Sequence, residues 1–77
     1  MRSRLKDARV HAGYTQKQLA LILGVSQQTV SKYETEAITP SHFRTIREYE
    51  RVLGVEAEAL FPDIFIEKTS HIIKVTQ

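Results

Sequence analysis

Apolar residues recur every three or four positions over residues 2–61, the period of amphipathic helices. The pattern predicts helices over about residues 2–12, 16–23, 27–35, 41–53 and 56–61. The fourth has the longest apolar face, formed by Phe43, Ile46, Tyr49 and Leu53, and Glu50 falls unexpectedly at its edge. Together these segments predict an all-α domain of five helices.

The residues between the second and third segments have the chemistry of helix ends. Thr15 precedes the second segment and Gln18 follows three residues later, which is the spacing of a capping box. Ser26 is placed to cap the third segment. Gly24 can adopt the positive φ that reverses the chain between them. We therefore expect two short helices joined by a tight turn.

The last segment, residues 63–77, differs in composition and predicts an extension to a domain formed by residues 1–62. It is rich in β-branched and aromatic residues: Ile64, Phe65, Ile66, Ile72, Ile73 and Val75. This composition favours a strand or a hairpin that turns near residues 69–70. Because a strand needs a partner, we expect a dimer contact made by Ile64, Ile66, Ile72, Ile73 and Val75. The alternatives are that the segment folds back over its own helices near Leu21 or that it is partly disordered.

Composition agrees with an ordinary globular domain. Of the 77 residues, 42% are hydrophobic and 26% are charged, which argues against a disordered chain. The absence of cysteine excludes disulfides and thiolate metal sites. No apolar run approaches the roughly 20 residues that a membrane span needs. We therefore expect a cytoplasmic protein with no membrane contact.

Charge is distributed unevenly along the chain. Residues 1–32 contain six Lys or Arg against one acid, whereas residues 33–67 contain three against eight acids. A basic half beside an acidic half can mark a face that binds a polyanion. Chance clustering of solvated charges is the alternative.

No set of catalytic or metal-binding residues is evident. His11, His42 and His71 are scattered without the spacing of metal ligands. There is no Gly-rich phosphate loop and no Ser/His/Asp cluster. We therefore expect a protein that is not an enzyme, uses no cofactor and has no small-molecule site.

Residues 16–35 combine two helices whose contact positions suit close packing. Leu19 and Leu23 lie on the inner side of the first helix, and Ala20 is small where the helices would cross. Val30 and Tyr33, three residues apart on the second helix, face back onto the first. Two short helices packed across a glycine turn form a helix-turn-helix, the motif that places its second helix in the DNA major groove.

With its flanking residues, this stretch resembles the phage repressor and Cro-type helix-turn-helix proteins, the XRE family. The resemblance covers about residues 2–61. It rests on Gly13-Tyr14-Thr15-Gln16, Leu19-Ala20, Leu23-Gly24-Val25-Ser26, Tyr33-Glu34, Pro40 and Leu53-Gly54-Val55. It implies a five-helix, lambda-repressor-like fold that binds double-stranded DNA in a sequence-specific way.

The resemblance also assigns roles to individual residues. Base contacts are expected from the outward face of the third helix: Gln27, Gln28, Ser31 and Lys32. The resemblance also implies a phosphate contact by Gln16. Beyond the resemblance, further phosphate contacts are expected from five polar or basic residues: Arg2, Arg4, Lys6, Lys17 and Ser26. Structural roles within the motif are expected for Arg9, Ala20, Gly24, Val30, Tyr33 and Glu34.

Two features of this region bear on how the domain would bind DNA. Arg9 and Glu34 match an ion pair between the first and third helices of relatives, and an exposed pair contributes only about 0–1 kcal/mol. The loop after Glu34 has Glu36 at a position where relatives have glycine, and it contains no basic residue. A left-handed turn at Glu36 would be strained.

These observations predict a transcriptional regulator, specifically a repressor, that binds a near-palindromic operator as a homodimer. One alternative is a protein-interaction module that uses the acidic half of the chain as its surface. Another is an antitoxin or a restriction-system controller with the same DNA-binding domain.

Overall fold

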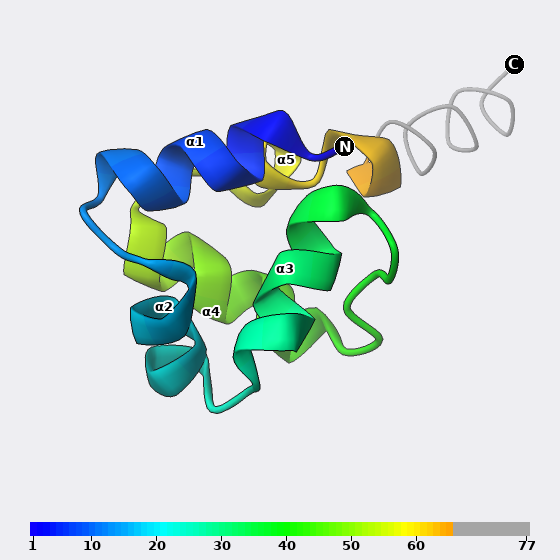
Figure 1. Ribbon diagram of the computed structural model, residues 1–77. Coiled ribbons are helices and arrows are strands. Elements are labelled where there is room, and N and C mark those ends of the chain that lie inside the picture. Colours follow the sequence, from blue (N-terminus) through cyan, green and yellow to red (C-terminus); the bar gives the residue numbers. More distant parts are fainter. Residues whose placement is uncertain (66–77) are drawn as a thin grey trace, which may run out of the picture.

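Five α-helices make up most of residues 1–65, the part of the chain that the structure describes; short turns join them, except for the longer loop 36–42 between the third and fourth (Figure 1). In this computed structural model they are α1 (Ser3–His11), α2 (Gln16–Leu23), α3 (Gln27–Thr35), α4 (Phe43–Leu53) and α5 (Ala57–Leu60). The prediction of an all-α, five-helix domain is confirmed. The bounds of α2 and α3 are those predicted, whereas α4 begins two residues later than predicted.

Local hydrogen bonds explain where α2 and α3 begin and end. The Thr15 hydroxyl accepts from the Gln18 N–H at 3.0 Å, and the Gln18 side chain accepts from the Thr15 N–H at 2.9 Å. This is the predicted capping box. The Ser26 hydroxyl caps α3 by accepting from the Thr29 N–H at 3.1 Å. Gly24 ends α2 in the left-handed conformation, with φ of 72°.

All five helices contribute side chains to one core. Its aromatic part is a row in which the Tyr49 ring contacts Tyr33 at 6.1 Å and Phe61 at 5.4 Å between centroids, both edge to face. Of the predicted inner residues of the motif, Leu23 is half-buried and packs against the core, and the others are buried: Leu19, Ala20, Val30 and Tyr33. Burial raises the pKa of the Tyr49 hydroxyl, which has no hydrogen-bond partner within residues 1–65. Tyr49 therefore stabilises the domain through the packing of its ring.

Glu50, the acid at the edge of the apolar face of α4, joins α4 to α5. Its carboxylate accepts a hydrogen bond of 2.8 Å from the backbone N–H of Ala57, the first residue of α5. The N–H groups in the first turn of a helix have no acceptor within the helix. Because Glu56 provides no side-chain cap, the Glu50 carboxylate supplies that acceptor.

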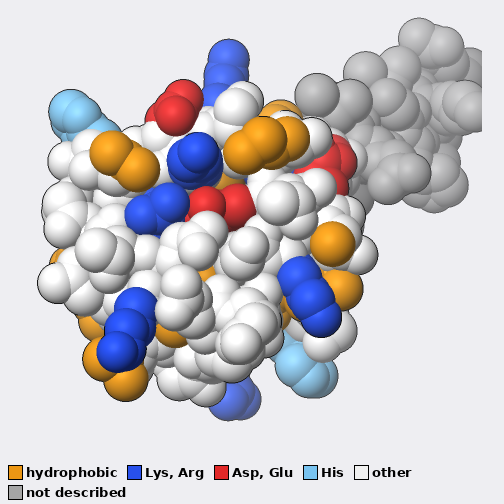
Figure 2. Space-filling model, viewed as in Figure 1, with side chains coloured by type: hydrophobic (Ala, Val, Ile, Leu, Met, Phe, Trp, Pro, Cys, Tyr) orange, Lys and Arg blue, Asp and Glu red, His pale blue; other side chains and the backbone are white. Residues whose placement is uncertain are grey.

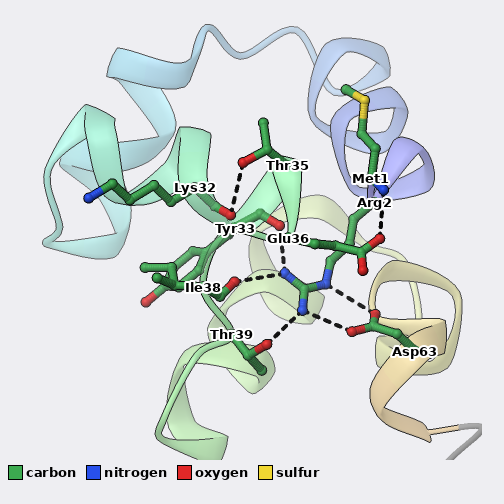
Figure 3. Close-up of polar contacts among 9 residues, drawn as sticks. All are labelled: Met1, Arg2, Lys32, Tyr33, Thr35, Glu36, Ile38, Thr39 and Asp63. Atoms are coloured by element: carbon green, nitrogen blue, oxygen red, sulfur yellow. Dashed lines mark hydrogen bonds and ion pairs between the residues drawn. The ribbon is translucent and has the colours of Figure 1, made fainter.

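The two ends of the described chain meet beside α3. The Arg2 guanidinium donates to both oxygens of the Asp63 carboxylate, at 3.1 Å from Nε and 2.9 Å from Nη2 (Figure 3). Residues 62–65 are helical, and Ile64 and Phe65 pack against the core. The strand predicted from residue 63 is therefore wrong for residues 63–65. Ile64, predicted at the dimer contact, packs against its own domain because the helical turn directs it there. The rest of the predicted extension lies outside the described residues.

Glu36 follows α3 in the left-handed conformation, with φ of 65° and ψ of 14°. It is the only non-glycine residue with positive φ in residues 1–65. A side chain in this conformation costs about 1–2 kcal/mol because Cβ crowds the backbone. The Glu36 carboxylate lies 2.8 Å from the Met1 ammonium group, in a pair that is open to solvent on both sides. Glu36 therefore has a backbone conformation that favours glycine, although it carries an acidic side chain.

Replacing Glu36 by glycine should stabilise the domain, and Glu36→Gln is the matched control. Both variants lose the ion pair with Met1, but only Glu36→Gly relieves the backbone strain. We expect the free energy of unfolding of Glu36→Gly to exceed that of Glu36→Gln by about 1 kcal/mol in urea denaturation. Equal stabilities of the two variants would show that Glu36 is not strained.

The Asp63 carboxylate should give the domain a pH-dependent stability. The hydrogen bond from Arg2 holds the pKa of Asp63 below its usual value. Its contribution is therefore complete above the unfolded pKa of about 3.9 and is lost as the pH falls through the folded pKa. We expect Asp63→Asn to lower the free energy of unfolding near neutral pH by about 1 kcal/mol, because solvent screens this half-open pair.

The difference between wild type and Asp63→Asn should be constant above about pH 5 and shrink below about pH 4. Urea denaturation at a series of pH values measures it. A difference that persists unchanged to the acid end of the series would exclude Asp63 as the titrating group.

Candidate nucleic-acid interface

The α3 helix has a buried inner face and a polar outer face. Its buried residues are Val30, Tyr33 and Glu34. The residues predicted to contact bases lie away from them: Gln27, Gln28 and Lys32 are exposed, and Ser31 is half-buried. Gln27 and Gln28 occupy the first turn, directly after the Ser26 cap. The structure therefore leaves the N-terminal end of α3 exposed, as a helix that enters the major groove of DNA requires.

The first turn of α3 is suited to reading base edges in DNA. A glutamine amide carries both a donor and an acceptor, so one side chain can form two hydrogen bonds with N6 and N7 of adenine. Gln27 and Gln28 are consecutive residues, and both are exposed. Two amides at the end of a fixed helix can thus distinguish one or two adjacent base pairs.

A buried ion pair fixes α3 against α1. Arg9 Nε donates to Glu34 Oε2 at 2.6 Å, and Arg9 Nη2 donates to Oε1 at 3.3 Å. The Arg9 and Glu34 side chains are only 9% and 2% exposed. The sequence-based expectation of an exposed, weakly stabilising pair is therefore wrong. Breaking a buried pair leaves an uncompensated charge, at a cost of about 3–5 kcal/mol.

Gln16, predicted to contact phosphate, joins the same network from α2. Its side-chain amide donates to Glu34 Oε1 at 3.2 Å. Arg9 Nη1 also donates to the Tyr14 carbonyl, at 2.8 Å, in the turn that precedes α2. The half-buried Gln16 side chain thus faces the protein, although its backbone N–H, in the first turn of α2, has no acceptor within the helix.

The predicted phosphate-binding residues divide into exposed and internal groups. Arg4, Lys6 and Lys17 are exposed, and so is Ser26, the residue whose hydroxyl caps α3. Figure 2 shows Lys and Arg side chains spread over this face, with Asp and Glu side chains directly beside some of them and hydrophobic side chains among them. Arg2 differs, because its side chain is 1% exposed and is paired with Asp63. The prediction that Arg2 contacts phosphate is therefore wrong: its charge is used inside the domain.

Sequence reasoning missed a histidine and an arginine that lie near the motif. His42 and Arg44 flank the first residue of α4 and are exposed. With Phe43 and Thr45 they line a shallow hollow that reaches Leu23 at the end of α2. The fourth segment falls in the acidic half of the chain, so its basic start was not considered. A count of basic residues at each helix N-terminus would have found it.

Other kinds of site find no support in the described part of the chain. Residues 1–65 contain no group of three His, Asp or Glu side chains placed to hold a metal ion. None of their helices combines the length and the apolar character needed to cross a bilayer. The remaining residues predicted at the dimer contact, Ile66, Ile72, Ile73 and Val75, lie outside the described residues.

Comparisons with known proteins agree with this geometry. The helix-turn-helix family matches residues 5–60, which include α2, α3 and the turn between them. The chain is similar to an SPbeta prophage-derived uncharacterized HTH-type transcriptional regulator, YonR, of Bacillus subtilis (strain 168). The two are 35% identical over 57 residues, which are 74% of this chain and 52% of that protein. The chain thus matches about half the length of this relative. No solved structure matches it significantly. The family match spans most of the described helices, and the chain belongs to the helix-turn-helix family.

Proposed function

We propose that the chain binds duplex DNA in a sequence-specific way and regulates transcription. The observation that carries this proposal is the α2–α3 pair, in which buried contacts fix α3 while Gln27 and Gln28 stay exposed at its first turn. In this arrangement α3 enters the major groove and its first turn contacts base edges. The Bacillus subtilis relative, described as a transcriptional regulator, supports the same function.

Phosphate contacts position the domain on the duplex in this proposal. The exposed cations Arg4, Lys6 and Lys17 bind the backbone, and Lys32 binds a guanine or a phosphate. The backbone N–H groups at the N-terminus of α2 add a further anion-binding point. This function places the protein in the cytoplasm and requires no catalysis. Repression, by occupation of the operator, is the form of regulation included in this proposal.

Two copies bind a near-palindromic operator in this proposal. Helix-turn-helix dimers place their recognition helices about 34–36 Å apart, one DNA turn, so that each copy binds one half-site. The composition of residues 66–77, with Ile66, Ile72, Ile73 and Val75, supports a contact between copies. A symmetric contact would bury these apolar side chains against their counterparts.

Replacing Gln27 or Gln28 by alanine should weaken binding to the best site selected from random DNA. Each loss should be about 1–3 kcal/mol and should relax the preference at one or two base pairs. Thr35→Ala, exposed at the opposite end of α3, is the matched control and should bind as wild type. Titrations at several salt concentrations measure two affinities, one for the selected site and one for a scrambled duplex of equal length.

Both affinities should fall steeply with salt, because bound Lys and Arg release counterions from phosphates. Wild-type affinity in both glutamine variants would show that another element reads the bases. A chain that binds only protein would show no salt-sensitive preference for any duplex.

Replacing Ile72 and Ile73 together by aspartate should convert the dimer to a folded monomer. Two charges in an apolar contact would be buried without partners, which strongly opposes association. Sedimentation at tens of micromolar measures the change, and operator binding should weaken far more than binding to scrambled DNA. Leu21→Asp, at a residue 77% exposed on α2, is the control and should leave the dimer intact. A monomeric wild type would contradict this part of the proposal.

A further inference from the structure

Arg2 has a buried guanidinium whose donors are all engaged (Figure 3). Nη1 donates to the Tyr33 carbonyl at 2.6 Å and to the Ile38 carbonyl at 3.0 Å. Nη2 donates to Thr39 Oγ1 at 2.9 Å and shares the Asp63 carboxylate with Nε. A guanidinium has five N–H groups, and here five hydrogen bonds use them.

These acceptors belong to the elements that hold the end of α3. Tyr33 lies in its last turn, where carbonyls lack donors within the helix and carry the negative end of the helix dipole. The Arg2 backbone N–H also donates to the Glu34 carbonyl, at 2.8 Å. Ile38 and Thr39 lie in the loop that leads from α3 to α4. Arg2 therefore caps α3 and fixes the following loop at the same time.

The planar shape of the guanidinium is essential to this arrangement. The group lies over the Phe61 ring, 5.3 Å from its centroid, while its edges reach acceptors from three segments of the chain. A lysine ammonium has three donors on one atom and could not reach all of these acceptors at once. The contacts thus depend on arginine geometry and not only on positive charge.

We propose that Arg2 is a positioning residue for DNA recognition, which holds the C-terminal end of α3 and the α3–α4 loop in place, with Asp63 as its anchor. The inference rests on the proposed function and assigns Arg2 no contact with DNA. It links residue 63, at the start of the C-terminal segment, to the recognition helix through one buried cation.

The mechanism follows from the length of α3. Nine residues at about 1.5 Å each make a helix about 13 Å long. Loosening its C-terminal end lets the helix tilt and shifts Gln27 and Gln28 at the opposite end. Hydrogen bonds to base edges weaken steeply once distance and angle depart from their optimum. Sequence-specific binding therefore suffers, whereas attraction to phosphates does not.

The test compares Arg2→Met, Arg2→Lys and Asp63→Asn with wild type in the full-length chain. Arg4→Met is the matched control, because Arg4 is exposed on the same helix two residues away. Affinity is measured for the selected operator and for a scrambled duplex over a series of salt concentrations. Circular dichroism defines a temperature at which each measured variant is folded. Should Arg2→Met fail to fold, Arg2→Lys and Asp63→Asn carry the test.

Both Arg2 variants should lose about 10- to 100-fold in operator affinity, the size of one or two base contacts, while scrambled-duplex affinity changes by less than about twofold. Their log–log salt slopes should equal that of wild type. Asp63→Asn should show the same pattern with a smaller loss. Arg4→Met should weaken both duplexes equally and make the slope shallower by about one, as expected for a lost phosphate contact.

Three outcomes would overturn the inference. A shallower slope with equal weakening of both duplexes in Arg2→Met would mean that Arg2 contacts phosphate. Recovery of operator affinity by Arg2→Lys would mean that charge alone suffices. A wild-type operator preference in both Arg2 variants would remove Arg2 from recognition while leaving the proposed function intact. By contrast, a wild-type chain without sequence preference would contradict the proposed function itself, and the inference with it.

Discussion

Three of the five helices meet at one buried carboxylate, that of Glu34 on α3. Burying an ionised group is expensive unless it is both paired and hydrogen-bonded. Arg9 from α1 supplies the opposite charge and Gln16 from α2 supplies a further donor. Only an arrangement that holds α1 and α2 in fixed places on α3 satisfies this group. The residue that constrains the core is therefore also the residue that holds α3, the helix proposed to read DNA.

The pairing of buried charges also explains part of the uneven charge distribution along the chain. Of the six Lys and Arg in residues 1–32, Arg2 and Arg9 are buried in ion pairs. Their partners, Glu34 and Asp63, belong to the acidic half. Part of the asymmetry between the halves thus reflects attraction within the domain, and four cations from residues 1–32 stay exposed: Arg4, Lys6, Lys17 and Lys32.

The sequence predicts α2 and α3 well because their ends are set by local chemistry. Thr15 with Gln18, Ser26 and Gly24 act within a few residues of themselves, so spacing alone suffices. The burial of Arg2 depends on acceptors 31 to 61 residues away, which no local pattern reveals. Composition likewise suggested a strand from residue 63, but packing on the core made residues 62–65 helical.

A recognition surface with few exposed cations depends more on geometry than on charge. Attraction to phosphates acts over about 10 Å at moderate salt and tolerates small displacements. Hydrogen bonds from glutamine amides to base edges are directional and tolerate far less. Under the proposed function, the internal use of Arg2 and Arg9 lowers the part of DNA binding that is independent of sequence. It also strengthens the supports of α3, the helix proposed to read sequence. A rigid α3 with modest surrounding charge favours discrimination between sites over affinity for DNA in general.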